Sequence, residues 1–248
     1  MPAQIALLVL VVVVLLWRAV SRERRDLARF RQLRSTVLRR KTLGRWILEA
    51  WIVLGGLSAV VLFAVWTSVP DALRDARGLF PFLSDDAAGG FVVGGTIAVV
   101  IGLIVPVFLL RGRIDEIPAV GNIRALLPRN RGELPYGAGL GLTAGIVEEV
   151  LFRLALPALV YAVSGNGAVA FVTCVVLFGL LHLYQGLKGM LAATVLGVIF
   201  TVFYVLSGNI LLVMALHVLF DLRSLVLIPV VLMGVGHRGE VETAKSST

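Results

Sequence analysis

VEEVLFR, residues 147–153, places two adjacent carboxylates and an arginine inside an apolar run that extends from Tyr136 to about Val163. A charged side chain at the centre of a bilayer costs at least about 2.5–3.5 kcal/mol, so such groups normally face a protein interior or a water-filled cavity. On a helix, Glu149 and Arg153 are four residues apart with the acid first, which favours an ion pair. Glu148 lies about 100° around the helix axis from Glu149. The stretch therefore predicts a functional site with Glu148 left available, although a purely structural ion pair is the alternative.

The composition of the whole chain is that of a membrane protein. Hydrophobic residues make up 58% of the 248 residues and charged residues only 15%, whereas soluble domains carry about 25% charged residues. Apolar runs fill most of the chain. We therefore expect an all-α, polytopic transmembrane helix bundle without a soluble module, in a bacterial cytoplasmic membrane.

Seven apolar segments are predicted to span the membrane, and turn-forming or charged residues separate them. They cover residues 5–17, 46–66, 91–110, 136–163, 168–184, 190–206 and 210–233. The first is short, about 24 Å when it is counted from Pro2 at 1.5 Å per residue. It needs Arg18 to extend its charged end to the interface, and whether it spans is left open. The turn-forming residues at 164–167, Ser-Gly-Asn-Gly, predict a tight hairpin between the fourth and fifth segments.

The formal charge of +8 is unevenly distributed, because eleven of the 23 basic residues lie between Arg18 and Arg45. Lys and Arg beside membrane spans set topology and contact anionic lipid, so we expect membrane lipid rather than nucleic acid as the partner. With the N-terminus outside and the C-terminus in the cytoplasm, every arginine-rich loop is cytoplasmic. The loop at 67–90, which has more acids than bases, is then outside. The segment 18–45 is expected to be an amphipathic helix on the membrane surface or a solvated linker.

The last three spans contain few other polar ionisable side chains, and these are His182, His217, Asp221 and Arg223. His217 and Asp221 are four residues apart and share one helix face. Two histidines and a carboxylate that converge with Glu148 form a set suited to hold and deprotonate a water, with or without a metal. Structural alternatives exist: a histidine that is only hydrogen-bonded in the core, an Asp221–arginine pair, and an Arg223 that extends to the inner interface.

Three motifs stand in order on three separate spans. They are Glu148-Glu149-x-x-x-Arg153, Phe178-x-x-x-His182 and His217-x-x-x-Asp221. Together they resemble the motifs of the CPBP family, which includes the type-2 CAAX prenyl endopeptidases and related bacteriocin-processing or immunity (Abi-like) proteins. The resemblance covers residues 136–233. The chain then divides into N-terminal membrane helices (1–135), a CPBP-like catalytic core (136–233) and a tail (234–248) that we expect to be disordered and cytoplasmic.

The resemblance implies an intramembrane endopeptidase that acts on a membrane-associated or lipid-modified peptide. Glu148 would activate the water that attacks the peptide carbonyl, and His182 would help to orient or deprotonate this water. His217 and Asp221 would hold the oxyanion. Glu149 and Arg153 would position Glu148.

Two chemical questions and one functional alternative stay open. The family often has Asn where this chain has Asp221, and an ionised Asp cannot donate a hydrogen bond to an oxyanion. Asp221 would therefore be protonated, bind a metal or orient His217. A metal-dependent version would hold a divalent cation such as zinc with Glu148, His182, His217 and Asp221. The alternative function is a non-catalytic cation or proton carrier or an immunity-type binding protein, although the internal repeats typical of transporters are not visible.

Overall fold

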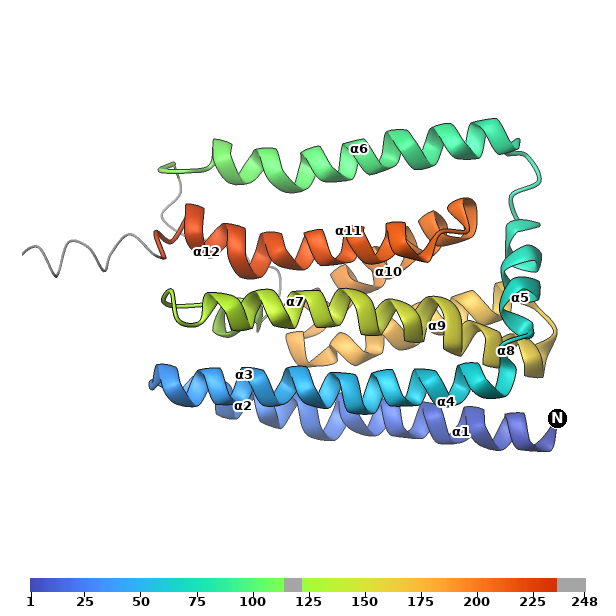
Figure 1. Cartoon of the computed structure of the whole chain (residues 1–248), viewed down its shortest axis with the longest axis horizontal. Helices are drawn as coiled ribbons and strands as arrows, with labels where there is room; N and C mark the ends of the chain where they lie inside the picture. Colours follow the sequence, from blue (N-terminus) through green and yellow to red (C-terminus); the bar gives the residue numbers. More distant parts are fainter. Residues whose placement is uncertain (114–121, 236–248) are drawn as a thin grey trace, which may run out of the picture.

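The computed structural model describes residues 1–113 and 122–235. Every regular element in these residues is a helix, which confirms the predicted all-α class. The long helices run along a common axis, and α5 (Ser68–Arg77) lies across the end of the bundle where the N-terminus is found (Figure 1). Helix α12 (Ile228–Val231) ends at the opposite end of the bundle. The protein is therefore a polytopic helical bundle.

The N-terminal half forms three long helices besides α5. The first consists of α1 (Pro2–Trp17), the π-helical turn η1 (Arg18–Glu23) and α2 (Arg24–Gln32). The second consists of α3 (Thr36–Ala50), the π-helical turn η2 (Trp51–Gly55) and α4 (Gly56–Val65). The third is α6 (Asp85–Leu109), which runs along the far side of the bundle (Figure 1).

The C-terminal half begins with a short 3-10 helix, η3 (Asn122–Leu126), followed by a helical hairpin and two further long helices. The hairpin consists of α7 (Leu134–Glu149), the π-helical turn η4 (Val150–Ala155), α8 (Leu156–Ser164) and α9 (Gly167–Leu181). The remaining elements are η5 (His182–Gln185), α10 (Leu187–Ser207), α11 (Ile210–Leu222) and the π-helical turn η6 (Arg223–Leu227), which leads into α12. The predicted tight turn at 164–167 is confirmed: Gly165 is left-handed at φ 64°, and Asn166 caps α9 by accepting from the Val169 N–H.

Six helices in the described residues are long and apolar enough to cross a membrane. They are Pro2–Gln32, Thr36–Val65, Asp85–Leu109, Gly167–Gln185, Leu187–Ser207 and Ile210–Val231. The helix from Leu134 to Ser164, the predicted fourth span, lies among them (Figure 1) but is less apolar because it contains two glutamates and an arginine. The number of spans and the side on which each terminus lies therefore stay predictions.

The basic segment 18–45 forms parts of two long helices, so the prediction of one separate helix or a linker is wrong, whereas its place at the membrane surface stays a prediction. Its first part continues the first long helix to Gln32, and its last part begins the second at Thr36. Arginine, leucine and alanine are good helix formers, so the helix propagates beyond the apolar run. Ser35 accepts from the Leu38 N–H and starts the next helix. The predicted outer loop 67–90 contains α5, and the predicted tail from residue 236 onward lies outside the described residues.

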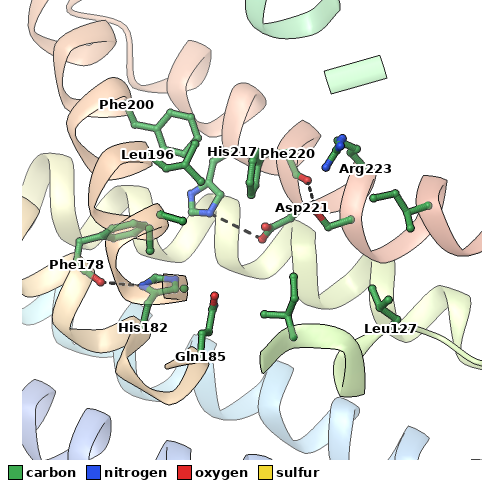
Figure 2. Close-up of a pocket in the computed structure, with 16 residues that line it drawn as sticks. Leu127, Phe178, His182, Gln185, Leu196, Phe200, His217, Phe220, Asp221 and Arg223 are labelled. Carbon is green, nitrogen blue, oxygen red and sulfur yellow. Dashed lines mark hydrogen bonds and ion pairs between the residues drawn. The ribbon is translucent and has the colours of Figure 1, made fainter. Parts of the chain in front are cut away.

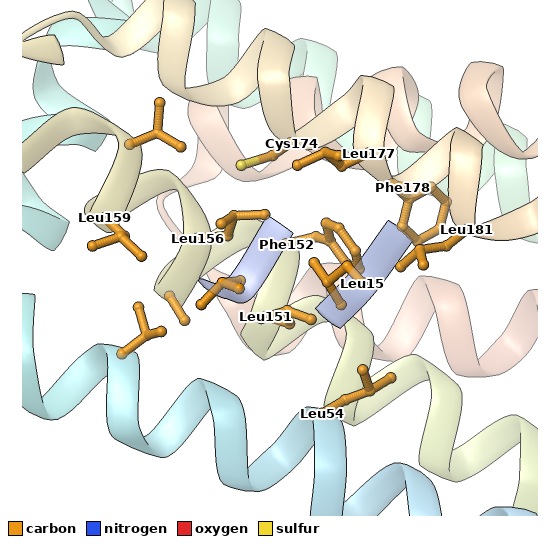
Figure 3. Packing of buried hydrophobic residues seen from close by; sticks show 14 of the residues in the cluster. Leu15, Leu54, Leu151, Phe152, Leu156, Leu159, Cys174, Leu177, Phe178 and Leu181 are labelled. Carbon is orange, nitrogen blue, oxygen red and sulfur yellow. The ribbon is translucent and has the colours of Figure 1, made fainter. Parts of the chain in front are cut away.

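The core surrounds η4 and α8, which lie at the centre of the bundle. Figure 3 shows side chains of this segment packed against helices from both halves of the chain, including Leu15, Leu54, Leu151, Phe152, Leu156, Leu159, Cys174, Leu177, Phe178 and Leu181. In a bilayer, lipid tails are as apolar as these side chains, so close packing rather than exclusion of water holds such helices together.

A row of glycines lets α7 approach α11 closely. Gly137, Gly141 and Gly145 lie four residues apart on one face of α7. A Cβ on Gly141 would lie 2.9 Å from the Cβ of Asp221, and a Cβ on Gly145 would lie 2.7 Å from the backbone nitrogen of Val218. The contact therefore depends on glycine, and it brings the end of α7 beside His217 and Asp221.

A buried ion pair between Arg39 and Glu133 joins the start of α3 to the start of α7. The Arg39 Nε donates to both carboxylate oxygens at 3.0 Å, and its Nη2 donates to the carbonyls of Ala125 and Leu127 at 3.1 and 3.3 Å. Both residues are 0% exposed. Removing one partner of such a pair costs about 3–5 kcal/mol. The pair therefore fixes the chain after η3 against the N-terminal half.

Replacement of Gly145 by Ala should destabilise the bundle. The added methyl group meets the backbone of α11, which cannot move aside as a flexible side chain does, and overpacking of this kind costs about 1–3 kcal/mol. Thermal unfolding of the purified protein in lipid would measure the loss. Gly102→Ala is the matched control because nothing lies within 4 Å of its Cβ. Equal unfolding temperatures for the two variants would contradict the proposed close contact.

Candidate active site

Glu148, the next-to-last residue of α7, lies on the wall of a cavity of about 270 Å³. Its Oε2 atom is shielded from solvent and has no hydrogen-bond partner among the described residues. A buried, unsatisfied polar atom is costly and calls for an explanation, such as a water or a ligand. The availability of Glu148, predicted from its helical position, is therefore supported by the geometry.

Glu149 lies on the other side of the helix and is fully buried. Its Oε2 is 3.1 Å from the Arg153 Nε, which confirms the predicted ion pair. Its Oε1 is 2.6 Å from the Nδ1 of His217 on α11. Among the described residues, neither Glu149 nor Arg153 is hydrogen-bonded to Glu148. Glu149 thus orients His217, whereas the sequence predicted that it positions Glu148.

Arg153 is held by three elements at once. Its position in the π-helical turn η4 directs the guanidinium toward α10, where Nη2 donates to the carbonyl of Gly197 at 3.2 Å. The guanidinium lies 4.8 Å from the ring centre of Phe178 and 5.8 Å from that of Phe200. Its side chain is 1% exposed. Arg153 is therefore a neutralising and structural group, shielded from the cavities.

His182 stands where α9 ends and the 3-10 turn η5 begins. Its Nδ1 is 2.8 Å from the carbonyl oxygen of Phe178, as the dashed line in Figure 2 marks. Because a carbonyl can only accept, this contact requires a proton on Nδ1. In the neutral ring, Nε2 is then an acceptor. His182 is therefore suited to accept a hydrogen bond from water in the cavity.

His217 lies between two carboxylates and two aromatic rings. Its Nδ1 contacts Glu149, and its Nε2 is 3.8 Å from Oδ2 of Asp221 (Figure 2). The second distance is an ion-pair separation, too long for a direct hydrogen bond. The rings of Phe178 and Phe200 lie 6.1 and 5.1 Å away between centres. His217 is thereby fixed in orientation, with Nε2 directed to the side that carries Asp221.

Two cavities meet at these residues. The larger one is lined by Glu148, and a smaller one of about 170 Å³ lies between α10, α11 and η3 (Figure 2). His182, His217 and Asp221 line both. Since one water takes about 30 Å³ of liquid volume, each cavity has room for several waters. The structure therefore brings together Glu148, His182, His217 and Asp221, with Glu149 and Arg153 buried behind them.

The predicted metal ligands do not stand as one compact group. Among the described residues, no three His, Cys, Asp or Glu side chains are grouped so that they could hold one ion. The Nδ1 atoms of His182 and His217 are bonded to the Phe178 carbonyl and to Glu149, which leaves each Nε2 free, and such contacts are also found behind metal-bound histidines. The divalent cation therefore stays a prediction, and we derive no step through a metal.

Arg223 and Arg18 both differ from their predicted positions. The Nε of Arg223 donates to the carbonyl of Leu103 on α6 at 2.9 Å, and the residue lines the smaller cavity rather than extending to the interface. Arg18 was expected to extend its charged end to the membrane interface. Its side chain is 12% exposed and lines the larger cavity. Both arginines therefore turn into the protein.

Sequence reasoning missed two polar residues of the cavity wall, Tyr184 and Gln185. The Gln185 Nε2 donates to the Tyr184 hydroxyl at 3.0 Å, and Gln185 lines both cavities. Figure 2 shows its side chain directed into the smaller cavity from the turn that follows His182. Their position within three residues of His182 was the only signal in the sequence.

Comparison with known proteins agrees with the three motifs. Residues 130–223 match a family model described as type II CAAX prenyl endopeptidase Rce1-like. The comparisons with curated proteins and with solved structures gave no match. The matched segment contains all six predicted site residues: Glu148, Glu149, Arg153, His182, His217 and Asp221. The segment 130–223 is thus similar to the Rce1-like type II CAAX prenyl endopeptidases, in agreement with the resemblance that the motifs predicted.

Proposed function

We propose that this integral membrane protein is an endopeptidase that hydrolyses a peptide bond of a membrane-associated or lipid-modified, CAAX-like substrate. One observation carries the proposal: the carboxylate of Glu148, whose Oε2 has no partner among the described residues, and the imidazole of His182 line the same cavity, which has room for several waters. The Rce1-like match over residues 130–223 supports the same class of reaction.

In the proposed reaction, Glu148 is the general base. It takes a proton from a water, the water oxygen attacks the peptide carbonyl carbon, and the protonated Glu148 returns the proton to the leaving nitrogen as the C–N bond breaks. The Nε2 of His182 accepts a hydrogen bond from the same water and orients it. No further reactant is required, because water supplies both the hydroxyl and the proton of the products.

We propose that His217 stabilises the oxyanion by donating a hydrogen bond to it. The carboxylates of Glu149 and Asp221 flank its ring, an arrangement that stabilises an imidazolium by electrostatic attraction. An imidazolium donates from both nitrogens, so Nδ1 serves Glu149 and Nε2 is left for the oxyanion. We therefore propose that Asp221 orients and balances the charge of His217 rather than contacting the oxyanion itself.

The substrate is proposed to approach from the cytoplasmic side of a bacterial membrane. The larger cavity extends from Glu148 toward residues of η1, α2 and α3, elements that together hold ten of the 23 basic residues. With these elements in the cytoplasm, the cavity opens where the lipid-attached end of a cytoplasmic protein is found.

Glu148→Gln and His182→Ala should each abolish hydrolysis while the protein still inserts and folds. Loss of a general acid–base residue lowers rates by about 10²–10⁴-fold, and both side chains lie on the wall of the larger cavity, so their replacement removes no apolar core residue. The measurement is cleavage of a library of lipidated and unmodified peptides by the purified protein in lipid vesicles. Glu49→Gln is the matched control, because it neutralises another carboxylate on the wall of the same cavity.

Hydrolysis that persists in Glu148→Gln would reject the assignment of the base. If the unmodified protein cuts no peptide but conducts ions across vesicles, and Glu148→Gln does not, the protein is a carrier.

Exhaustive chelation should leave the activity within about twofold of its starting value, since the described residues provide no grouped ligand set. Cleavage would be measured before and after dialysis against a strong chelator and then during titration with Zn²⁺. Activity that disappears on chelation and returns with stoichiometric Zn²⁺ would instead establish a metal-dependent reaction.

A further inference from the structure

Arg18 lies in the wall of the larger cavity, which also contains Glu148 and His182. It opens the π-helical turn η1, and η1 packs against η5, the turn that begins with His182. π-helical turns inside long helices are frequent at functional sites. A cationic side chain from the first helix thus shares a cavity with the proposed general base.

The guanidinium of Arg18 has hydrogen-bonding capacity that the protein does not use. Its Nε and Nη1 are shielded from solvent and have no hydrogen-bond partner among the described residues. Its Nη2 lies 3.6 Å from Glu23, a separation that gives attraction without a hydrogen bond. A guanidinium has five N–H donors in a planar fork, and leaving them buried and unpaired is costly.

Other buried arginines in the described residues differ in this respect. Arg39, Arg77 and Arg153 also have a shielded nitrogen without a partner, but each donates at least one direct hydrogen bond to a carboxylate or carbonyl. None of these three lines either cavity. Arg18 combines unsatisfied donors with a position on the cavity wall. The two donors are shielded in the unliganded protein, so binding of a ligand requires the guanidinium to turn them toward the cavity.

We propose that Arg18 binds the C-terminal carboxylate of the substrate peptide, an inference that rests on the proposed peptidase function. A carboxylate matches the fork of a guanidinium with two parallel N–H···O bonds. Arg18 lies outside the segment 130–223 that matches the family model. The N-terminal helices would thus contribute substrate selection to a site whose reacting groups come from the C-terminal half.

This assignment sets the position of the cleaved bond relative to the C-terminus of the substrate peptide. With the free carboxylate at Arg18 and the reacting carbonyl beside Glu148, both within one cavity of about 270 Å³, only a bond near the C-terminus is presented.

Acidic residues also line this cavity, and they set the main competing interpretation. Glu23, Asp26 and Glu49 would favour a cationic group instead. Each of these carboxylates, however, makes interactions within the protein. Arg18 could also only balance the charge of Glu148, in which case its loss would affect acid and amide substrates alike. A comparison of the two substrates separates these possibilities.

The test measures binding in the Glu148→Gln background, so that no substrate is consumed. The probe is a fluorescent peptide with a prenylated cysteine followed by three apolar residues, made once with a free C-terminal carboxylate and once with a C-terminal amide. We expect the acid to bind at least about tenfold more tightly than the amide, as for a charge-assisted hydrogen-bonded pair. Adding Arg18→Gln should remove this preference by weakening acid binding alone.

Two further variants make the result decisive. Arg18→Lys keeps the charge but loses the fork, so it should retain only part of the preference. Arg29→Gln, which removes an exposed arginine from the same long helix, should retain all of it. Binding of the amide peptide serves as the folding control, because it does not depend on Arg18. If Arg18→Gln does not fold, an unchanged ratio of acid to amide affinity in Arg18→Lys overturns the proposal.

Equal binding of acid and amide by the parent, no binding of either, or an unchanged ratio in Arg18→Gln would also overturn it. Cleavage of the acid peptide by the unmodified protein is measured in parallel. Arg18-dependent acid binding without cleavage would keep this inference and reject the peptidase. Cleavage without acid preference would reject this inference and keep the peptidase.

Discussion

The carboxylate of Glu149 is the contact on which the site depends. It pairs with Arg153 one helical turn later and with His217 on α11, 68 residues further along the chain. In the low dielectric of a membrane bundle, an unpaired carboxylate would be too costly to bury. The same pairing that makes burial tolerable therefore fixes α7 and η4 against α11, and it sets the orientation of the imidazole that faces the cavity.

Two adjacent glutamates acquire opposite environments from this arrangement. Glu149 is ion-paired with Arg153 and bonded to His217, whereas Glu148 lies on the wall of a cavity and its Oε2 has neither a hydrogen-bond nor an ion-pair partner among the described residues. Pairs of titratable groups in contrasting surroundings commonly divide into a structural and a reacting member. The glycine row on α7 is the second requirement, since α11 could not otherwise lie close enough for His217 to reach Glu149.

The sequence predicted those features that depend on local spacing. The helices, the turn at 164–167 and the Glu149–Arg153 pair follow from apolar runs, turn residues and a four-residue interval. It missed Arg39 with Glu133, which are 94 residues apart, and the bond from Glu149 to His217, because no local pattern encodes such partners. The π-helical turns after Trp17, Glu149 and Leu222 were also not predictable, since apolar periodicity does not distinguish a widened turn from a regular one. The three motifs identified the site, but the roles within it required tertiary contacts.

The cavity walls show that the Rce1-like segment does not make the whole site. Residues of η1, α2, α3 and η2 line the larger cavity opposite Glu148, and all of them precede residue 130. The proposed reacting groups and the wall opposite them thus come from different halves of the chain. On the proposed substrate selection, changes in the first two long helices would alter which peptide end is accepted without disturbing the contacts of Glu149. The buried Arg39–Glu133 pair joins the start of α3, which contributes to this wall, to the start of α7, which carries the proposed base, so the wall and the base belong to one packed structure.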